Sequence, residues 1–228
     1  MTIWILWLIA AYLLGSVSFA LMLGRLKGID IRSQGSGNLG ATNAGRVLGK
    51  KWGIGCCLLD LGKGLVPVLG YALSVNLAGH PPTSSAWAGA LLWLMIGLAA
   101  VLGHVFPIWL KFKGGKGAAT SFGALLGFWP VLTAPALASA VIWYAVTRKT
   151  AYVGLASVVA ALSIPVMTIA SGLIQQRPPG EIAVYGGFTA LLAALVVARH
   201  RSNLARLRTG TEAKVDWAQR DKRPAKEA

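Results

Sequence analysis

The feature that most constrains this sequence is a series of long apolar stretches separated by short polar segments. The stretches cover residues 3–23, 53–77, 87–102, 118–132, 134–146, 152–174 and 182–198. A helix needs about 20 mostly apolar residues to cross the hydrocarbon core of a bilayer. The pattern therefore predicts an all-α integral membrane protein with seven transmembrane helices. The stretches 118–132 and 134–146 are short for such helices.

The composition excludes an ordinary soluble domain. Of the 228 residues, 55% are hydrophobic and 13% are charged, and the mean hydropathy is +0.62. A soluble domain of this size carries about 25% charged residues. The spans leave little room for a second domain. We therefore predict one membrane domain over residues 1–214 and a basic cytoplasmic tail over residues 215–228.

The basic residues are distributed unevenly along the chain. There are 22 Lys and Arg against 7 Asp and Glu, which gives a formal net charge of +15. Of the 22, 20 lie in the segments 25–52, 111–116, 148–149 and 199–226, and the other two are Lys63 and Arg177. Cytoplasmic loops are enriched in Lys and Arg. We therefore expect the N-terminus outside and the C-terminus in the cytoplasm.

The placement of these charges also indicates what the protein binds. Because they lie between apolar spans, they favour anionic lipids or an anionic substrate over nucleic acid. The first basic residue, Arg25, follows the first stretch, so we expect an uncleaved helix and no signal peptide. The adjacent Cys56 and Cys57 lie in an apolar stretch and indicate neither a disulfide framework nor a metal site.

The polar segment GHVFPIWLKFKGGKGAAT links the third and fourth apolar stretches. The glycines around Lys116 are Gly114, Gly115 and Gly117. Glycines leave backbone N–H groups uncovered, and the start of a helix favours an anion. We therefore predict a phosphate site in which Lys116 is catalytic and the glycines contact the substrate. The alternative is a basic loop that only sets the membrane topology.

The first glycine-rich segment along the chain, GSGNLGATNAGR (residues 35–46), follows the first apolar stretch. The residues predicted to bind substrate there are Ser36, Gly37, Asn38, Thr42, Asn43 and Arg46. The spacing matches GxGxxG, but a dinucleotide site needs a preceding soluble strand, and this segment follows a membrane helix. The planar guanidinium of Arg46 can hold a phosphate through two hydrogen bonds. The alternative is a polar linker.

A third polar pattern lies in the segment RHRSNLARLRTGTEAKV. His200, Asn203 and Arg206 recur at a spacing of three and share one face of a helix. Histidine and asparagine add little to lipid attraction, so they favour a site over the alternative, a basic helix that binds lipid headgroups. The predicted topology puts all three polar segments on the cytoplasmic face, where they suit a phosphate-bearing substrate.

The second apolar stretch contains two ionisable residues, Asp60 and Lys63, three positions apart on one helix face. Charged groups among apolar residues are costly unless they are paired or functional. A simple ion pair and a catalytic role both stay open for these residues.

The segments GSGNLGATNAGR, GHVFPIWLKFKGGKGAAT and RHRSNLARLRTGTE resemble the three signature stretches of the bacterial acyl-phosphate-dependent glycerol-3-phosphate acyltransferases. LLDLGKG, residues 58–64, is similar to a further feature of that family. The resemblance extends from the first apolar stretch to about Lys214. It implies a seven-helix enzyme of the bacterial plasma membrane whose active site faces the cytoplasm, with no metal and no other cofactor.

The same resemblance implies the reaction and its participants. The chain would transfer an acyl group from acyl phosphate to the 1-position of glycerol 3-phosphate, giving lysophosphatidic acid for phospholipid synthesis. Membrane phospholipids surround it, and an enzyme that forms acyl phosphate is the expected upstream partner. The matching positions make Ser36, Arg46, Lys116 and His200 candidates for holding substrate phosphate, with Asn38 and Asn203 in support. Catalytic roles are expected for Lys116, His200 and Arg46.

The sequence departs from the family pattern at one position. A serine often precedes a leucine at the start of the sixth span, but here that position is Gly154. Ser157, three residues later, is the candidate to supply the missing hydroxyl contact with the substrate.

The chemistry implied by the family fits these residues. An acyl phosphate is a mixed anhydride with an activated carbonyl, so the protein mainly has to bring two anions together and stabilise their charge. The sequence shows no Ser-His-Asp arrangement, so we expect no acyl-enzyme intermediate. We expect a substrate phosphate to take the proton of the attacking hydroxyl, with His200 orienting that phosphate.

A membrane transporter of organic phosphates is the alternative from another functional class. It would share the basic loops and the apolar spans, but transporters often have repeated halves and ionisable groups near the middle of the bilayer. The sequence shows no convincing repeat, and its polar segments are predicted at one surface. These two features favour the enzyme.

Overall fold

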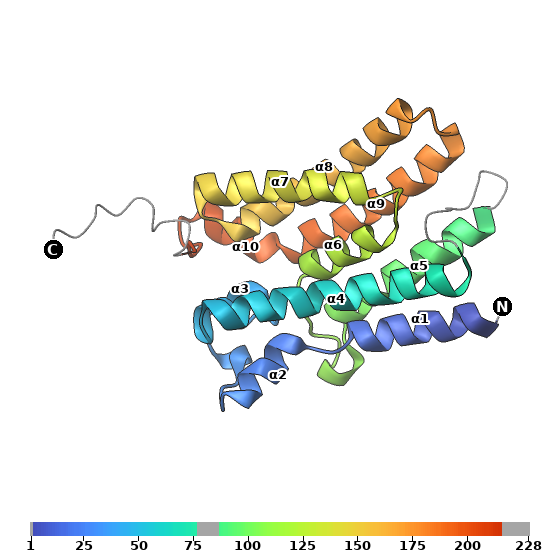
Figure 1. The fold of residues 1–228 in the computed structure, drawn as a ribbon. Coiled ribbons are helices and arrows are strands. Elements are labelled where there is room, and N and C mark those ends of the chain that lie inside the picture. Colours follow the sequence, from blue (N-terminus) through green and yellow to red (C-terminus); the bar gives the residue numbers. More distant parts are fainter. Residues whose placement is uncertain (1, 77–86, 216–228) are drawn as a thin grey trace.

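The computed structural model describes residues 2–76 and 87–215, which form a bundle of helices without strands in the described part (Figure 1). The α-helices are α1 Thr2–Gly15, α2 Phe19–Leu26, α3 Ala41–Val47, α4 Lys50–Ser74, α5 Trp87–Val105, α6 Ala118–Gly127, α7 Thr133–Thr150, α8 Val153–Ile174, α9 Pro179–Arg199 and α10 Arg201–Arg208. Within the described residues, two single turns of 3₁₀-helix, η1 Ile31–Ser33 and η3 Ile108–Leu110, lie in the connections.

Several of these helices can cross a membrane by length and composition. Among the described residues, four segments meet both conditions, namely α4, Gly89–Leu110, α8 and α9. A fifth follows if α1 and α2, which meet at a bend of 42°, are counted as one broken span. The prediction of an all-helical membrane protein is confirmed by these spans and by the integral membrane relatives described below. The count of seven and the orientation of the termini stay predictions.

The helix in the predicted fourth span is shorter than expected. α6 has ten residues and a length of about 15 Å, half of a hydrocarbon core. It packs closely against α4, because a Cβ on Gly64 would overlap the Thr120 carbonyl oxygen and a Cβ on Gly123 would overlap that of Leu61. Small residues let two helix backbones approach in this way. The start of α6, which follows the GGKG segment (residues 114–117), is therefore packed firmly against the long helix α4.

The predicted first span, residues 3–23, is not continuous but breaks at residues 16–18. The Ser16 hydroxyl donates a hydrogen bond to the Tyr12 carbonyl (2.8 Å), and the Ser18 side chain accepts one from the Leu21 amide (3.4 Å) at the start of α2. The Val17 carbonyl, in the break, accepts a hydrogen bond from the Lys63 ammonium at 2.7 Å. A break in a membrane helix is tolerated where such partners satisfy the freed backbone groups.

An aromatic cluster forms the centre of the apolar core. The ring of Phe128 meets the rings of Trp93 and Phe188 edge to face, with centroids 5.0 and 5.5 Å away. The Trp93 indole N–H donates to the Val68 carbonyl (3.0 Å), so its polar edge is satisfied inside the core. These contacts join α4, α5 and α9 around the end of α6.

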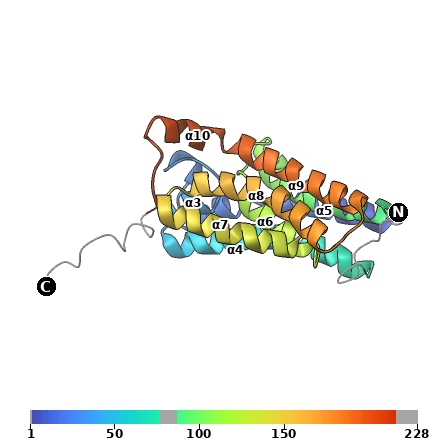
Figure 2. The same cartoon turned by 90° about the horizontal axis from the view of Figure 1, so that it is seen from above.

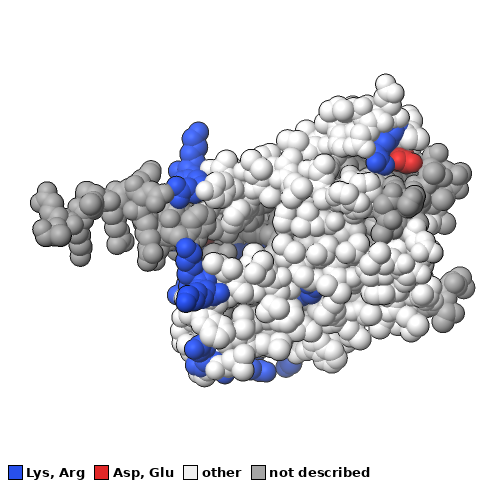
Figure 3. All heavy atoms as spheres, in the orientation of Figure 1, with Lys and Arg blue, Asp and Glu red and all other residues white. Residues whose placement is uncertain are grey.

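The bundle has two different ends. α1 begins at one end, whereas α3, α10 and the start of α4 lie together at the other (Figures 1 and 2). Lys and Arg side chains gather at the α3 and α10 end (Figure 3). At the opposite end, Arg177 in the connection between α8 and α9 forms an ion pair with Glu181 in the first turn of α9. The segment 78–86, between the second and third apolar stretches, and the predicted tail, apart from Val215, lie outside the described residues.

Candidate active site

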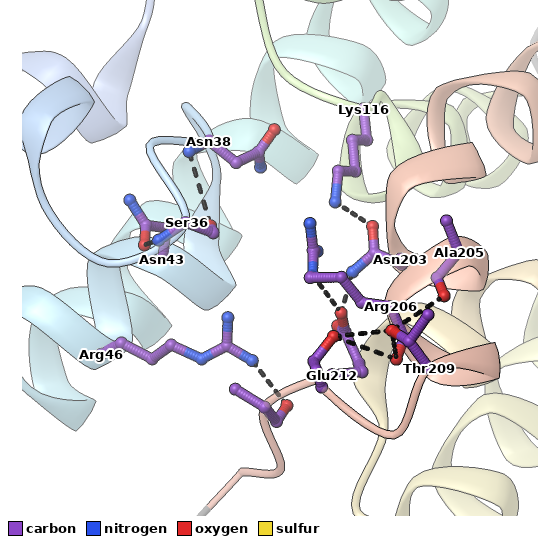
Figure 4. Close-up of polar contacts among 12 residues, drawn as sticks. Ser36, Asn38, Asn43, Arg46, Lys116, Asn203, Ala205, Arg206, Thr209 and Glu212 are labelled. Carbon is purple, nitrogen blue, oxygen red and sulfur yellow. Dashed lines mark hydrogen bonds and ion pairs between the residues drawn. The ribbon is translucent and has the colours of Figure 1, made fainter.

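The three polar segments singled out in the sequence meet at the basic end of the bundle. Figure 4 shows Arg46 of α3 and Lys116 of the GGKG segment pointing from two sides toward Asn203, Arg206 and Glu212. The Lys116 ammonium donates a hydrogen bond to the Asn203 side-chain carbonyl. Arg46 donates to the Ala213 carbonyl at 2.8 Å. Segments up to 167 positions apart in sequence thus form one polar site.

Asn43 shapes the first glycine-rich segment from within. Its side-chain oxygen accepts the Ser36 amide (2.8 Å), and its NH₂ group donates to the carbonyls of Ile31 (3.2 Å) and Gln34 (3.1 Å). The residue is 0% exposed. This use of the amide differs from the predicted substrate contact, because Asn43 holds the loop while Ser36 stays exposed at its tip.

The other predicted residues of this segment lie around that loop. Gly37 has φ +66°, in the left-handed region that favours glycine, and turns the chain after Ser36. The Asn38 amide N–H is 3.5 Å from the Ser36 hydroxyl. Asn38 and Thr42 are half-buried, and Arg46 is exposed one turn along α3. The segment is therefore folded and presents Ser36 and Arg46 on its surface.

The GGKG segment is attached to the bundle on two sides. The amides of Gly114 and Gly115 donate to the carbonyls of Val105 (3.2 Å) and His104 (3.1 Å) at the end of α5. The Arg199 guanidinium donates to the carbonyls of the same two glycines at 3.3 Å. The expectation that these two amides face a phosphate is corrected, because α5 already holds them. Their carbonyls and amides instead fix the backbone beside Lys116.

Gly115 also brings the two glycine-rich segments into contact. A Cβ at this position would overlap the His104 imidazole and would lie 2.7 Å from the Leu39 carbonyl oxygen. Gly117, with φ +83°, then begins α6. The sequence GGKG is thus required for close packing on one side of Lys116 and for a left-handed turn on the other.

Glu212 organises the third segment and was missed in the sequence analysis. Its carboxylate accepts hydrogen bonds from the Asn203 amide (2.6 Å) and the Arg206 guanidinium (2.7 Å), and it is 7% exposed. The Glu212 amide donates to the Arg206 carbonyl (3.1 Å), so the chain turns back onto α10. Asn203 therefore bridges Glu212 and Lys116, and its side chain is fixed from both ends.

The charges at this site do not balance. Burial lowers the pKa of Lys116 to about 8, and the positive charge of Arg206 is the next cause, with smaller contributions from Arg46 and Arg199. Glu212 opposes this shift but does not cancel it. A group of cations with one carboxylate favours an anion, and strongly shifted pKa values often mark functional sites.

His200 lies between α9 and α10, buried at the same end of the molecule. Its Nδ1 atom is 2.8 Å from the Val196 carbonyl, so Nδ1 carries the proton and donates it. Burial, with a smaller contribution from the nearby Lys116 charge, lowers the pKa of His200 to about 4. The ring is therefore neutral at physiological pH, with Nε2 as an acceptor.

Ser157 and Gly154, the positions where the family pattern is altered, have different surroundings. The Ser157 hydroxyl donates to the Val153 carbonyl (2.9 Å) and accepts the Trp143 indole N–H (3.3 Å). Gly154 lies against Asn203, and a Cβ there would be 2.7–2.9 Å from three Asn203 atoms. The missing side chain thus makes room for Asn203, while Ser157 is held between α7 and α8.

Comparison with known proteins identifies the family. A family model described as glycerol-3-phosphate acyltransferase matches residues 5–210. This chain belongs to the glycerol-3-phosphate acyltransferase family. Its relatives named glycerol-3-phosphate acyltransferase include one from Trichlorobacter lovleyi, 43% identical over 214 residues (94% of this chain, 98% of the relative). One from Geobacter sulfurreducens is 42% identical over 202 residues (89% and 92%).

Two crystal structures share the fold of this acyltransferase. The glycerol 3-phosphate form of PlsY (YgiH), an integral membrane glycerol 3-phosphate acyltransferase, superposes with a TM-score of 0.78 at 34% identity (96% of this chain, 99% of that chain). The lysophosphatidic acid form gives 0.74 at 36% identity (92% and 94%). The predicted family and the predicted acyltransferase activity on glycerol 3-phosphate are confirmed, and the transporter alternative is set aside.

Proposed function

We propose that this acyltransferase takes its acyl group from acyl phosphate and attaches it to the 1-position of glycerol 3-phosphate, releasing phosphate. Its product is lysophosphatidic acid, which enters phospholipid synthesis. The observation that best supports the proposed donor is the excess of cations around Lys116. Among the described residues whose charge acts on Lys116, three are arginines, Arg46, Arg199 and Arg206, and one is a carboxylate, Glu212. A reaction between two phosphate-bearing molecules needs such a site, because their charges repel each other as they approach.

The reaction mainly requires the protein to position the two substrates and to stabilise their negative charge. The hydroxyl oxygen of glycerol 3-phosphate forms the new bond to the acyl carbon, and the bond from that carbon to the phosphate oxygen breaks. Holding the two reactants in line and stabilising the developing negative charge lowers the barrier. Lys116 and Arg46 approach the site from different segments and are suited to separate contacts with the two anions.

Product analysis tests the proposed donor. Purified protein is given glycerol 3-phosphate with acyl phosphate, acyl-CoA or acyl carrier protein loaded with the same chain. We expect 1-acyl-glycerol 3-phosphate and free phosphate from acyl phosphate alone. Equal product from a thioester donor would overturn the assignment of the donor and leave the acyltransferase activity intact.

The proton of the attacking hydroxyl is assigned to a substrate phosphate. A phosphate monoester has a second pKa of about 6, whereas the pKa of His200 is about 4. A base is most effective when its pKa is near the working pH, so the phosphate is the better acceptor. Because Nδ1 of His200 carries the proton, Nε2 can accept a hydrogen bond from a substrate hydroxyl. His200 then orients the nucleophile, and not the phosphate as the sequence analysis expected, because an unprotonated Nε2 cannot donate a hydrogen bond to a phosphate oxygen.

Replacing His200 by glutamine tests this assignment. Glutamine keeps a polar group near the Nε2 position, so we expect kcat to fall less than tenfold while KM for glycerol 3-phosphate rises. General-base catalysis contributes about 10²–10⁴-fold. Steady-state kinetics separate the two cases, and a thousandfold fall in kcat with unchanged KM would make His200 the base.

Arg46→Lys is expected to raise KM for glycerol 3-phosphate by about tenfold or more. Lysine keeps the charge but cannot form two parallel hydrogen bonds to phosphate, and it also loses the contact with the Ala213 carbonyl. Lys50→Arg, an exposed basic change at the start of α4, is the control. An unchanged KM in Arg46→Lys would assign Arg46 to membrane topology alone.

The proposal includes seven crossings, an outside N-terminus and a cytoplasmic site in the bacterial plasma membrane. The gathering of Lys and Arg at the α3 and α10 end supports this orientation. Cysteines introduced at Gln175 and Thr209, in a background without Cys56 and Cys57, are expected to react with an impermeant thiol reagent from opposite sides. Labelling of both from one side would refute the topology.

A further inference from the structure

A buried group of ionisable residues behind the active site has no part in the proposed chemistry. It consists of Asp60 and Lys63 of α4 and His104 of α5, here called the inner charge cluster. Their exposures are 2%, 3% and 7%. We propose that this cluster positions the GGKG segment, and through it Lys116, in the reaction proposed above, on which this inference rests.

Asp60 is the centre of the cluster, and its shortest contact is with Lys63. The Lys63 ammonium is 2.9 Å from Asp60 Oδ1 and donates to the Val17 carbonyl at 2.7 Å. His104 Nδ1 faces the same Asp60 oxygen at 3.6 Å, beyond hydrogen-bond distance, and has no hydrogen-bond partner among the described residues. The Cys56 thiol donates to the other Asp60 oxygen at 3.7 Å. The Asp60–Lys63 ion pair considered in the sequence analysis is therefore formed, and His104 and Cys56 also lie next to Asp60.

Stability alone does not explain a buried group of this kind. Removing charges from water is costly, and apolar residues of similar size often serve a core equally well. Within a membrane span the cost is an added reason to look for a function. Lys63 does satisfy the Val17 carbonyl at the break between α1 and α2. That contact gives a structural reason for a lysine at position 63, but it gives none for His104.

His104 connects the cluster to the active site. Its carbonyl accepts the Gly115 amide at 3.1 Å, and its Nε2 edge occupies the space where a Cβ of Gly115 would lie. Gly115 is the neighbour of Lys116 in the chain. The imidazole is thus placed between Asp60 on its Nδ1 side and the GGKG backbone on its Nε2 side. A rotation of the imidazole ring would therefore change its contact with Gly115.

The GGKG segment is also contacted from two other sides. Arg199 holds the carbonyls of Gly114 and Gly115 from the α9 side, and the Leu39 carbonyl approaches Gly115 from the first glycine-rich segment. The His104 imidazole contacts the GGKG segment on the side that faces α4. A displacement of about 1 Å at a reacting group can cost about a hundredfold in rate. His104 is 7% exposed, so we assign it as a positioning residue and not as a catalytic one.

Three variants separate the two contacts of His104. His104→Ala removes both, His104→Asn keeps a polar group near Nδ1, and His104→Gln keeps one near Nε2. We expect His104→Ala to lower kcat/KM for glycerol 3-phosphate ten- to hundredfold. His104→Gln should recover more of that loss than His104→Asn, because it restores the support of Gly115. Equal activity of all three with the parent would overturn the proposal.

The charge pair is tested with a matched control. Asp60→Asn removes the charge that pairs with Lys63 and faces His104, and Glu181→Gln makes the same change in the ion pair at the opposite end of the bundle. We expect a tenfold or greater fall in kcat/KM for Asp60→Asn and less than twofold for Glu181→Gln. Equal falls in both would show that any lost ion pair has this effect.

Folding and function are measured separately. The thermal unfolding midpoint of each variant is recorded with and without glycerol 3-phosphate, since a ligand that binds the folded state raises it. The expected signature is a smaller rise with ligand than in the parent. The midpoint without ligand should fall in Asp60→Asn, because Lys63 stays buried without its partner, so the comparison uses the rise and not the midpoint itself. The double variant Asp60→Leu with Lys63→Met removes both charges. If it is stable and fully active, the cluster is structural only, and if it does not fold, the His104 series decides.

The same data distinguish failure of this inference from failure of the proposed function. If the parent protein does not use acyl phosphate, the donor proposal fails. The rise in unfolding midpoint with glycerol 3-phosphate still reports the position of Lys116, because it does not depend on the donor. A rise equal to that of the parent in Asp60→Asn and in His104→Ala would then overturn the inference.

Discussion

Lys116→Ala is expected to lower kcat by about 10²–10³-fold, the cost of removing one preorganised donor to a developing negative charge. The ammonium is held by the Asn203 carbonyl, which is itself fixed by Glu212, so its position does not have to be organised during the reaction. Lys113→Ala, a change of an exposed lysine in the same segment, is the control. We expect the control to retain at least half of the activity, and a comparable result for Lys116→Ala would refute the assignment.

The lowered pKa of Lys116 adds a pH test to this prediction. The protonated amine is the form that binds phosphate, and its pKa is about 8 in the free protein. kcat/KM should therefore fall as the pH rises through about 8, since this parameter reports groups of the free enzyme. A guanidinium stays protonated over this range. In Lys116→Arg this fall in kcat/KM should occur at a higher pH. A fall at the same pH as in the parent would show that another group causes it.

Much of the architecture could be predicted from local properties of the chain. Apolar stretches of sufficient length predict membrane helices, and the distribution of Lys and Arg predicts that three polar segments share one end. The structure brings Lys116 and Asn203 into contact and places Arg46 across from them. These inferences held because each depends on composition within a short window.

The parts that could not be predicted depend on contacts between distant segments. The break at residues 16–18 is stabilised by Lys63, which is 46 positions away from Val17. Glu212 is recognised as part of the site only when the chain turns back onto α10. His104 lies in the polar segment that links the third and fourth apolar stretches, and no role was predicted for it. No local pattern indicates that its ring supports Gly115 and contacts Asp60.

Gly115 is where these distant contacts meet, and Gly115→Ala is expected to reduce kcat/KM at least a hundredfold. The added Cβ would overlap the His104 ring and approach the Leu39 carbonyl to 2.7 Å, so the GGKG backbone has to move. Overpacking of this kind costs about 1–3 kcal/mol of stability. The loss of activity should exceed this cost, because Lys116 moves with its neighbour. Gly187→Ala is the control, since a Cβ there meets no atom within 4 Å.

A double-mutant cycle shows whether the His104 ring is the obstacle. Removing the imidazole in His104→Ala makes space for the new methyl group, although the Leu39 carbonyl still limits it. The combined variant should therefore lose less activity than the product of the two single losses, because residues in contact are not additive. Unfolding midpoints measured beside the kinetics separate lost stability from misplaced Lys116. Independent losses would show that Gly115→Ala acts through Leu39 and the first glycine-rich segment, and not through His104.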